Sequence, residues 1–232
     1  MQDFGITTFN SKGQLKQIEN AIKAVSNGEL SIGLTAKDAV ILISEKTSKN
    51  PLIDFNSIHK VEKLSNNQQC TYAGLSADFK VLVQKARKEN TKYKMQYNED
   101  VPLSYSSRKI ANIMQESTQS GGVRPFGVGI ILAGTDGDNN VGLTQIDPSG
   151  AYYDVYATAL GKNENNAKLF LEKRWKRDMS EEDVLILGLK CLKESFDGDI
   201  KEFNVEISIL KNDSIKQLST EEIKDYLNVI NN

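Results

Sequence analysis

Apolar residues recur at helical spacing near the start of the chain and then alternate as they do in strands. The first pattern predicts an amphipathic helix over residues 13–26. Apolar alternation over residues 30–34, followed by an unbroken apolar run over residues 39–43, predicts a hairpin that enters a core. Two further strands, separated by a polar segment, are expected at residues 58–64 and 70–75.

Two consecutive helices come next in the pattern. Ser76 is placed to cap the first, whose apolar face gives way to a basic and polar end at Lys94. The second repeats the apolar spacing between Ile110 and Ser117. Turns rich in glycine, aspartate and asparagine then separate three strands, which we expect at residues 127–133, 141–146 and 151–158.

The last part of the chain is predicted to hold three helices and one strand. A short helix follows Asn166, and Ser180 opens a variant capping box for the next helix. The buried face of that helix is expected to hold Val184, Leu187, Gly188, Cys191, Leu192 and Ser195. Alternation from Phe203 to Ile209 predicts a strand, and Ser219 with Glu222 forms a capping box for the terminal helix.

Strands that bury one face and helices that come in pairs predict an α+β fold. Two sheets pack against each other and helix pairs cover their outer faces, which gives four layers. A length of 232 residues with 39% hydrophobic composition suffices for one sizeable core. We therefore expect a single domain over residues 1–232, divided into a tail and helix at 1–28 and a sandwich at 29–232.

Charge and cysteine content narrow the classes of function. The 29 basic and 31 acidic side chains leave a net charge of −2, so no broad field attracts nucleic acid or an anionic membrane. Cys70 and Cys191 are far apart and are expected to be small buried hydrophobes in a reducing compartment. Without a leader pattern or a stretch of roughly 20 apolar residues, the chain is expected to be soluble and intracellular. His59 is the only histidine, so we expect a strand-end or surface residue, with neither a metal nor a cofactor.

Two other local features have plain structural readings. Gly121 and Gly122 lack the lysine and hydroxyl residue of a phosphate loop, so they are expected to stop a helix before a strand. The basic run of residues 173–177 could bind nucleic acid or direct nuclear import. A solvated helix face is favoured, because Glu172 and Asp178 flank the run.

Two blocks, Thr118–Val128 and Thr144–Tyr152, are too specific in order and spacing to be generic turns. The first leaves a helix for a strand. The second joins two strands through Asp147-Pro148-Ser149-Gly150, whose residue order suits a type I turn. These blocks resemble 20S proteasome α subunits, and the resemblance is closest to the eukaryotic type-2 subunit. Further matching segments lie at residues 8–15, 17–19, 58–62, 170–174, 192–198 and 224–227.

The resemblance covers essentially the whole chain and implies both a fold and a function. The fold would be the αββα sandwich of N-terminal nucleophile hydrolases with an additional N-terminal helix. The function would be that of a non-catalytic structural subunit in a heptameric α ring, which stacks on a ring of β subunits. Such a subunit forms the channel through which substrates enter and docks regulatory particles for ubiquitin-dependent protein degradation, in cytoplasm and nucleus.

The same resemblance argues against catalysis. In the related β subunits a threonine, exposed by cleavage after glycine, attacks with its own α-amine as base. Matching residues 33–40 to the β-subunit strand pair puts Glu29 at that position, directly after Gly28. Glu45 occupies the supporting acidic position, where we expect a solvated carboxylate. Thr7 and Thr8 precede the helix rather than the strand, so no catalytic residue is expected.

Two sites are implied by resemblance alone. Lys60 matches a lysine that pairs with the C-terminal carboxylate of activator tails, in pockets between neighbouring α subunits. Gly74 and Leu75 would add backbone and apolar contacts to the same tail. The open alternative is that Lys60 is an ordinary exposed lysine.

The gate over the axial channel is the second site, and here the chain departs from the family pattern. Phe4, Gly5, Ser11 and Asn20 stand where family members carry Tyr-Asp, Pro and Tyr. Both phenolic hydroxyls and the carboxylate are missing, so a minor contribution to gating is expected. Two other functions stay open: a stand-alone amide hydrolase of the same fold, and a chaperone-like scaffold that never enters the particle.

Overall fold

The computed structural model describes residues 7–48, 50, 52–136, 140–196 and 198–231. Its helices are α1 (Lys16–Ser26), α2 (Ser76–Tyr97), α3 (Leu103–Gln119), α4 (Glu164–Arg174), α5 (Glu181–Ser195) and α6 (Thr220–Asn231). Its strands are β1 (Ser31–Thr35), β2 (Ala39–Glu45), β3 (Val61–Ser65), β4 (Gln68–Gly74), β5 (Val128–Thr135), β6 (Val141–Ile146), β7 (Tyr152–Asp154), β8 (Ala157–Leu160), β9 (Val205–Lys211) and β10 (Ser214–Gln217). Short 3₁₀ turns cover Phe55–Ser57 and Glu202–Asn204.

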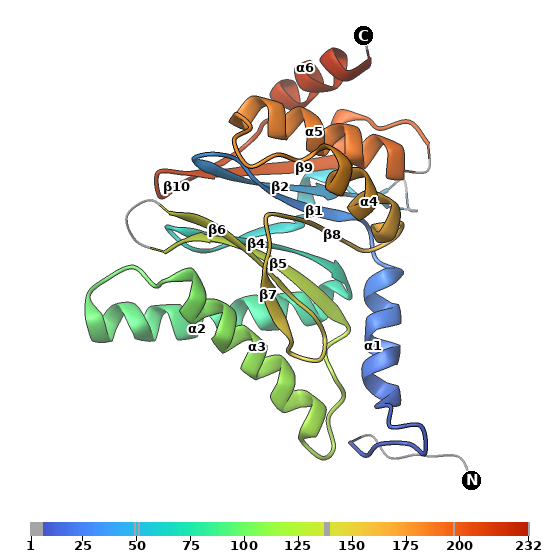
Figure 1. Ribbon diagram of the computed structural model, residues 1–232, viewed down its shortest axis with the longest axis vertical. Coiled ribbons are helices and arrows are strands. Elements are labelled where there is room, and N and C mark those ends of the chain that lie inside the picture. The colour runs from blue at the N-terminus through green and yellow to red at the C-terminus, as the bar shows by residue number, and fades with distance from the viewer. Residues whose placement is uncertain (1–6, 49, 51, 137–139, 197, 232) are drawn as a thin grey trace.

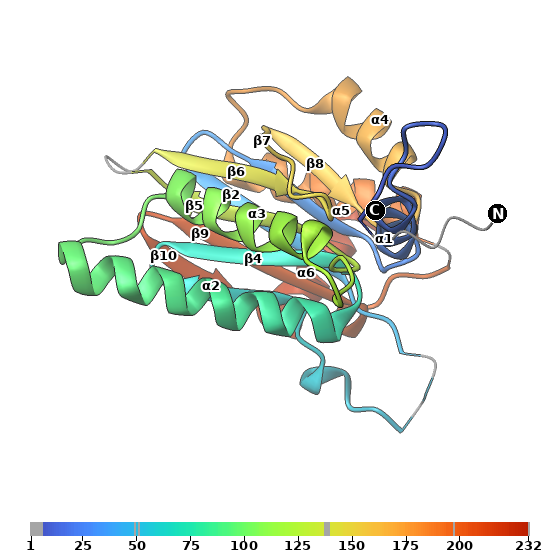
Figure 2. The ribbon, with the colours of Figure 1, turned by 90° about the horizontal axis from the view of Figure 1, so that it is seen from below.

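In the part of the chain that the structure describes, the strands form two antiparallel sheets of five strands each. One has the order β10-β9-β2-β1-β8 and the other β3-β4-β5-β6-β7. Helices α4, α5 and α6 lie outside the first sheet, and α2 and α3 lie across the outer face of the second (Figures 1 and 2). The predicted four-layer αββα sandwich is confirmed.

Apolar side chains fill all three spaces between the layers. Leu34, Ile43 and Leu187 belong to the core between the first sheet and its helices. Phe79 and Met114 belong to the core between the second sheet and α2 and α3. The space between the two sheets holds Val40, Leu42, Ala73, Ile131, Ala133 and Leu143. Within the described residues, no helix has both the length and the apolar character needed to cross a membrane.

Helix α1 lies outside the four layers, beside one end of the sandwich (Figure 1). Ala21 and Val25 are its buried residues. Val25 packs over Gly129, where an added Cβ would come within 3.1 Å of Val25 Cγ1. Just after the helix, Gly28 packs even more closely against Gly74, because a Cβ on Gly28 would lie 2.2 Å from the backbone nitrogen of Gly74. The helix is therefore fixed to the sheet by its C-terminal end.

The predicted cap of α5 and the predicted capping box of α6 are confirmed. The Ser180 hydroxyl accepts a hydrogen bond from the Asp183 amide at 3.2 Å and donates to Asp183 Oδ2 at 2.7 Å. The Ser219 amide donates to Glu222 Oε2 at 2.8 Å, and the Glu222 amide donates back to Ser219 Oγ at 3.3 Å. The two helices thus begin where local hydrogen bonding alone places them.

Other boundaries were predicted wrongly. Ser76 is the first residue of α2 rather than its cap. The expected strand at residues 151–158 is two strands, because the chain passes from one sheet to the other: Val155 donates to the Leu143 carbonyl and Thr35 donates to the Tyr156 carbonyl. Gln68 and Gln69 pair in β4, so the polar segment 65–69 is mostly strand. Phe203 lies in a 3₁₀ turn before β9, and β10 was not predicted.

Candidate functional site

Lys60 is buried at the end of the sandwich where α1 meets the sheets. It directly precedes β3, and its side chain is only 3% exposed. Its ammonium nitrogen lies 3.5 Å from Glu29 Oε2 and 4.2 Å from the centre of the Tyr72 ring. Lys60 is therefore not an ordinary exposed lysine, and that alternative is wrong.

Three carboxylates act electrostatically on this ammonium group, and Glu29 is the one that contacts it directly. Glu29 lies between α1 and β1. Glu45 ends β2 and accepts a hydrogen bond from the Leu30 amide at 3.2 Å. Glu206, near the start of β9, accepts from the Lys60 amide at 2.7 Å. We call Lys60, Glu29, Glu45, Tyr72 and Glu206 the Lys60 cluster.

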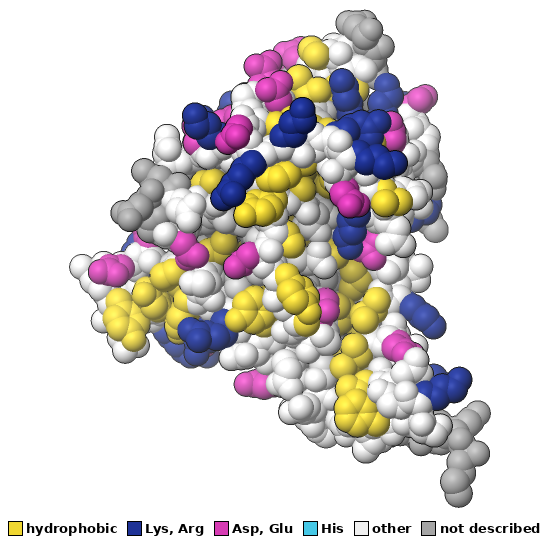
Figure 3. Space-filling view, in the orientation of Figure 1, with side chains coloured by type: hydrophobic (Ala, Val, Ile, Leu, Met, Phe, Trp, Pro, Cys, Tyr) yellow, Lys and Arg dark blue, Asp and Glu magenta, His cyan; other side chains and the backbone are white. Residues whose placement is uncertain are grey.

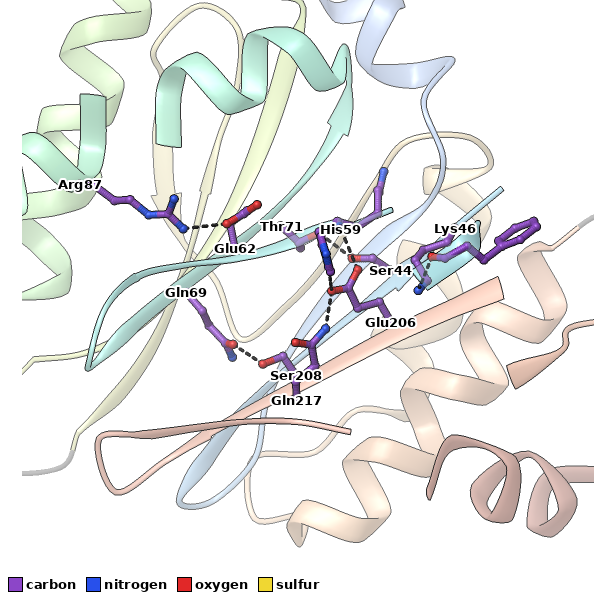
Figure 4. Close-up of polar contacts among 12 residues, drawn as sticks. Ser44, Lys46, His59, Glu62, Gln69, Thr71, Arg87, Glu206, Ser208 and Gln217 are labelled. Carbon is purple, nitrogen blue, oxygen red and sulfur yellow. Dashed lines mark hydrogen bonds and ion pairs between the residues drawn. The ribbon is translucent and has the colours of Figure 1, made fainter. Parts of the chain in front are cut away.

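Glu206 is the most enclosed carboxylate of the cluster. Figure 4 shows it between His59 and Gln217, close to the seam between the two sheets. Gln217 Nε2 donates to Glu206 Oε1 at 2.6 Å, and His59 Nδ1 lies 3.9 Å from the same oxygen. His59 itself is 59% exposed, as expected for a surface residue. Figure 4 also shows Ser44 with Thr71, and Gln69 with Ser208, joining strands of opposite sheets.

Burial dominates the electrostatics of the cluster. It lowers the pKa of the Lys60 ammonium, while Glu29 pulls that pKa upward by charge and hydrogen bonding. It raises the pKa of Glu45 and of Glu206, and the hydrogen bonds from backbone amides only partly oppose this. Glu45 is therefore half-buried and hydrogen-bonded, and the expectation of a solvated carboxylate there is wrong.

Gly74 and Leu75 lie at the same end of the molecule as Lys60. Gly74 has a φ of 113°, and a Cβ there would come within 2.3 Å of the Gly127 carbonyl oxygen. Its backbone also touches Gly28, the residue before Glu29. Leu75 is 46% exposed. The structure thus gathers Lys60, Gly74 and Leu75 around one sheet end, with Glu29 among them.

The chemistry of this end suits binding better than attack. Glu29 offers a carboxylate where the related hydrolases need a hydroxyl or thiol. The nearby hydroxyl of Ser31 is buried and donates to the Tyr72 carbonyl at 2.7 Å. Thr47 Oγ1 donates to Glu29 Oε1 at 3.3 Å. The nitrogen of Glu29 belongs to the peptide bond that joins it to Gly28, so it provides no α-amine to act as base.

The expected gate residues are only partly visible. Phe4 and Gly5 lie outside the described residues. Ser11 is exposed in the turn before α1, and Asn20 is exposed on α1. The turn is held by Asn10, whose side-chain oxygen accepts from the Lys12 and Gln14 amides at 2.9 Å each. Ser11 and Asn20 therefore lie on different structural elements, and Ser11 sits in an ordered turn.

Hydrogen bonds anchor both sequence blocks, and the sequence did not reveal those that hold the first block to Asp78. The Gly150 amide donates to the Asp147 carbonyl at 3.0 Å, as expected for the predicted turn. In the first block, both Arg124 terminal nitrogens contact Asp78 of α2, at 2.6 and 2.8 Å. Asp78 also accepts from the Gly127 amide at 2.9 Å. This carboxylate was missed because it lies 46 residues before its arginine.

The remaining candidates from the sequence are the two cysteines and the basic run of residues 173–177. Cys70 and Cys191 are buried, and burial raises the pKa of the Cys191 thiol to about 12. The basic run crosses the end of α4 rather than forming a helix face, because Trp175 caps the helix and donates from Nε1 to the Thr35 carbonyl at 2.9 Å. In Figure 3, basic side chains over α4 and α5 are interspersed with acidic ones. Over the described ranges, no three His, Cys, Asp or Glu side chains gather as metal ligands would.

The known proteins that are similar to this chain are proteasome subunits. A family model described as "Proteasome subunit" matches residues 25–210. The chain is 46% identical over 225 residues to "Proteasome subunit alpha type-2" of Dictyostelium discoideum, which covers 97% of this chain and 96% of the relative. The protein of that name from Oryza sativa subsp. indica is 45% identical over 225 residues, covering 97% and 95%. That from Drosophila melanogaster is 42% identical over 224 residues, covering 97% and 95%.

Proposed function

The chain belongs to the proteasome subunit family, and from this premise we infer that it is a structural α-ring subunit of the 20S core particle. It assembles with other proteasome subunits. In this assignment its neighbours are α subunits of a heptameric ring, and a ring of β subunits lies beneath. The similarity to α type-2 subunits over 97% of the chain supports the assignment.

The non-catalytic role is supported above all by the presence of Glu29 at the start of the sandwich. A nucleophile in this fold needs a hydroxyl or thiol and a free α-amine at that point. Here the side chain is a carboxylate paired with Lys60. The preceding residue, Gly28, is packed against Gly74 and accepts a hydrogen bond from the Lys162 amide at 2.8 Å. Nothing observed at this end favours the stand-alone amide hydrolase.

We assign the contribution of this subunit to two parts of the particle. The end of the sandwich near Lys60, Gly74 and Leu75 forms one wall of a groove completed by a neighbouring subunit. That groove takes the C-terminal carboxylate of a regulator's tail, with the ammonium as counter-charge and exposed Leu75 as apolar contact. The segment before α1 borders the channel that admits substrates, and the chain lacks the tyrosines of the usual gate at Phe4 and Asn20 and its aspartate at Gly5. The particle works in ubiquitin-dependent degradation, in cytoplasm and nucleus.

Native purification tests the assignment. A tag on this chain should recover a particle of many subunits, and the isolated chain should show no peptidase activity above a denatured control. A chain that migrates alone would favour a scaffold outside the particle. Activity that disappears on changing Glu29 or on blocking an exposed α-amine would support the hydrolase instead.

A further inference from the structure

Glu29 occupies the place from which an outside carboxylate would reach Lys60. We propose that Glu29 is a built-in competitor of the tail carboxylate, which must be displaced before a tail can pair with Lys60. The inference rests on the proposed docking of carboxylate tails and adds a regulatory element to that same site.

Exposure shows which side of the ammonium group is accessible. The Lys60 side chain is 3% exposed, whereas its partner Glu29 is 38% exposed. On another side the ammonium faces the Tyr72 ring at 4.2 Å, and Tyr72 is itself buried. Glu29 is thus the solvent-facing member of the pair. A carboxylate that arrives from solvent meets Glu29 before it meets Lys60.

Charge makes the obstacle stronger than simple occupation. Three carboxylates, of Glu29, Glu45 and Glu206, act on one ammonium group, and the field of each stabilises the charged lysine. A tail would bring a fourth carboxylate to an ammonium group that Glu29 already contacts at 3.5 Å. Repulsion between the tail carboxylate and Glu29 opposes binding, more strongly where water is partly excluded.

The contacts also show which carboxylate can move. Glu206 is held by the Lys60 amide at 2.7 Å and by Gln217 at 2.6 Å, and it is 3% exposed. Glu45 accepts from the Leu30 amide and is half-buried. Glu29 has two longer contacts, 3.5 Å to Lys60 and 3.3 Å from Thr47 Oγ1. Long hydrogen bonds are weak. Rotation of Glu29 toward solvent would break only these two long contacts, and an arriving tail carboxylate would replace Glu29 as the counter-charge of the buried ammonium group.

The consequence is a groove that accepts a tail only weakly until Glu29 moves. Removing the Glu29 charge with a side chain of the same shape should tighten tail binding about tenfold, which corresponds to about 1.4 kcal/mol. The gain should require both Lys60 and a free carboxylate on the tail. An amidated tail should bind wild type and Glu29→Gln equally.

The experiment uses assembled particles with a tail peptide as probe. The peptide ends in a free carboxylate and carries a photo-reactive side chain near its C-terminus, and an amidated version serves as its chemical control. The amount of peptide crosslinked to this chain is measured by mass spectrometry at a series of peptide concentrations. Because only this chain is counted, the measurement reports binding in this groove and not in others of the ring. The particles carry wild-type chain, Glu29→Gln, Lys60→Met or both. Glu62→Gln is the matched control, because Glu62 lies on β3 just after Lys60 but pairs with Arg87 of α2, at 2.7 Å.

We expect Glu29→Gln to tighten binding of the free-carboxylate peptide about tenfold, and Lys60→Met to abolish that gain. Glu62→Gln and the amidated peptide should show no such change. If Lys60→Met weakens binding but Glu29→Gln leaves it unaltered, the competitor role is wrong and tail docking stands. If no variant changes the crosslinking, or this chain is not labelled even with Glu29→Gln, tail docking at Lys60 is itself wrong. Equal incorporation of every variant into particles excludes a folding defect.

Discussion

Replacing Gly28 by alanine should separate α1 from the sandwich and loosen the Lys60 cluster. The new Cβ would lie 2.2 Å from the Gly74 nitrogen, 2.9 Å from Gly74 Cα and 3.1 Å from the Ala73 carbonyl carbon. All three atoms are backbone, so no side-chain rotation relieves the overlap. Ordinary contact begins at 3.4 Å, so the two segments must move apart by 3.4 − 2.2 = 1.2 Å.

The structure allows the size of the effect to be worked out. Overpacking of this kind costs about 1–3 kcal/mol. A shift of that length also disrupts the hydrogen bond from the Lys162 amide to the Gly28 carbonyl, now 2.8 Å, worth about 1 kcal/mol. We therefore expect Gly28→Ala to lower the free energy of unfolding by about 2–4 kcal/mol, the sum of these two costs.

Urea unfolding of the purified chain, followed by fluorescence, measures this change. Trp175 is the only tryptophan, and it stacks on Tyr156 with ring centres 5.2 Å apart, so its emission should report loss of the fold. Gly121→Ala is the control, because an added Cβ there meets nothing within 4 Å. It should be neutral or slightly stabilising, by up to about 1 kcal/mol. A Gly28→Ala variant as stable as Gly121→Ala would refute the tight junction between α1 and the sheet.

Three further predictions use the same unfolding assay. Burial raises the pKa of Glu206, so its contribution to stability is present below its unfolded pKa and is lost as pH rises through the folded value. The free energy of unfolding of Glu206→Gln should therefore rise relative to that of wild type as pH rises from about 4.5 to 7. A difference between the two proteins that stays constant with pH would contradict this. Asp78→Ala should cost about 1–2 kcal/mol at pH 7, because the Gly127 amide loses its acceptor and Arg124 loses its partner. Since hydrogen bonding from Arg124 lowers the Asp78 pKa, that cost should shrink as pH falls through the depressed value; persistence in strong acid would argue against the ion pair. Ser180→Ala should cost about 1 kcal/mol through loss of the α5 cap, whereas an unchanged midpoint would mean that the cap contributes nothing.

Local signals in the sequence predicted local structure well. The capping serines Ser180 and Ser219 act within three residues of themselves, so their sequence neighbours contain the whole interaction. The turn at Asp147 is set in the same way by its own four residues. The layer order also followed from pattern alone, because each strand and helix had to bury one face.

Features that depend on distant partners could not be read from the pattern. The switch between sheets at Val155 and Tyr156 depends on carbonyls and amides of β1 and β6, which no local period encodes. Burial of Lys60 depends on Glu29, 31 positions away, and on Glu206, 146 positions away. A lysine before a strand reads as exposed until those partners are known. The resemblance drew attention to Lys60, Glu29 and Glu45 separately, but it revealed neither that Glu29 pairs with Lys60 nor that Glu206 binds the Lys60 amide.

The central claim is that this chain is a non-catalytic ring subunit that keeps the segment before Glu29. Native mass spectrometry of particles purified through a tag on this chain, with subunits released in the instrument, tests it most directly. We expect a particle of many subunits that contains this chain, with a released mass that includes α1 and Gly28. A chain recovered alone, or one whose mass begins at Glu29, would contradict it.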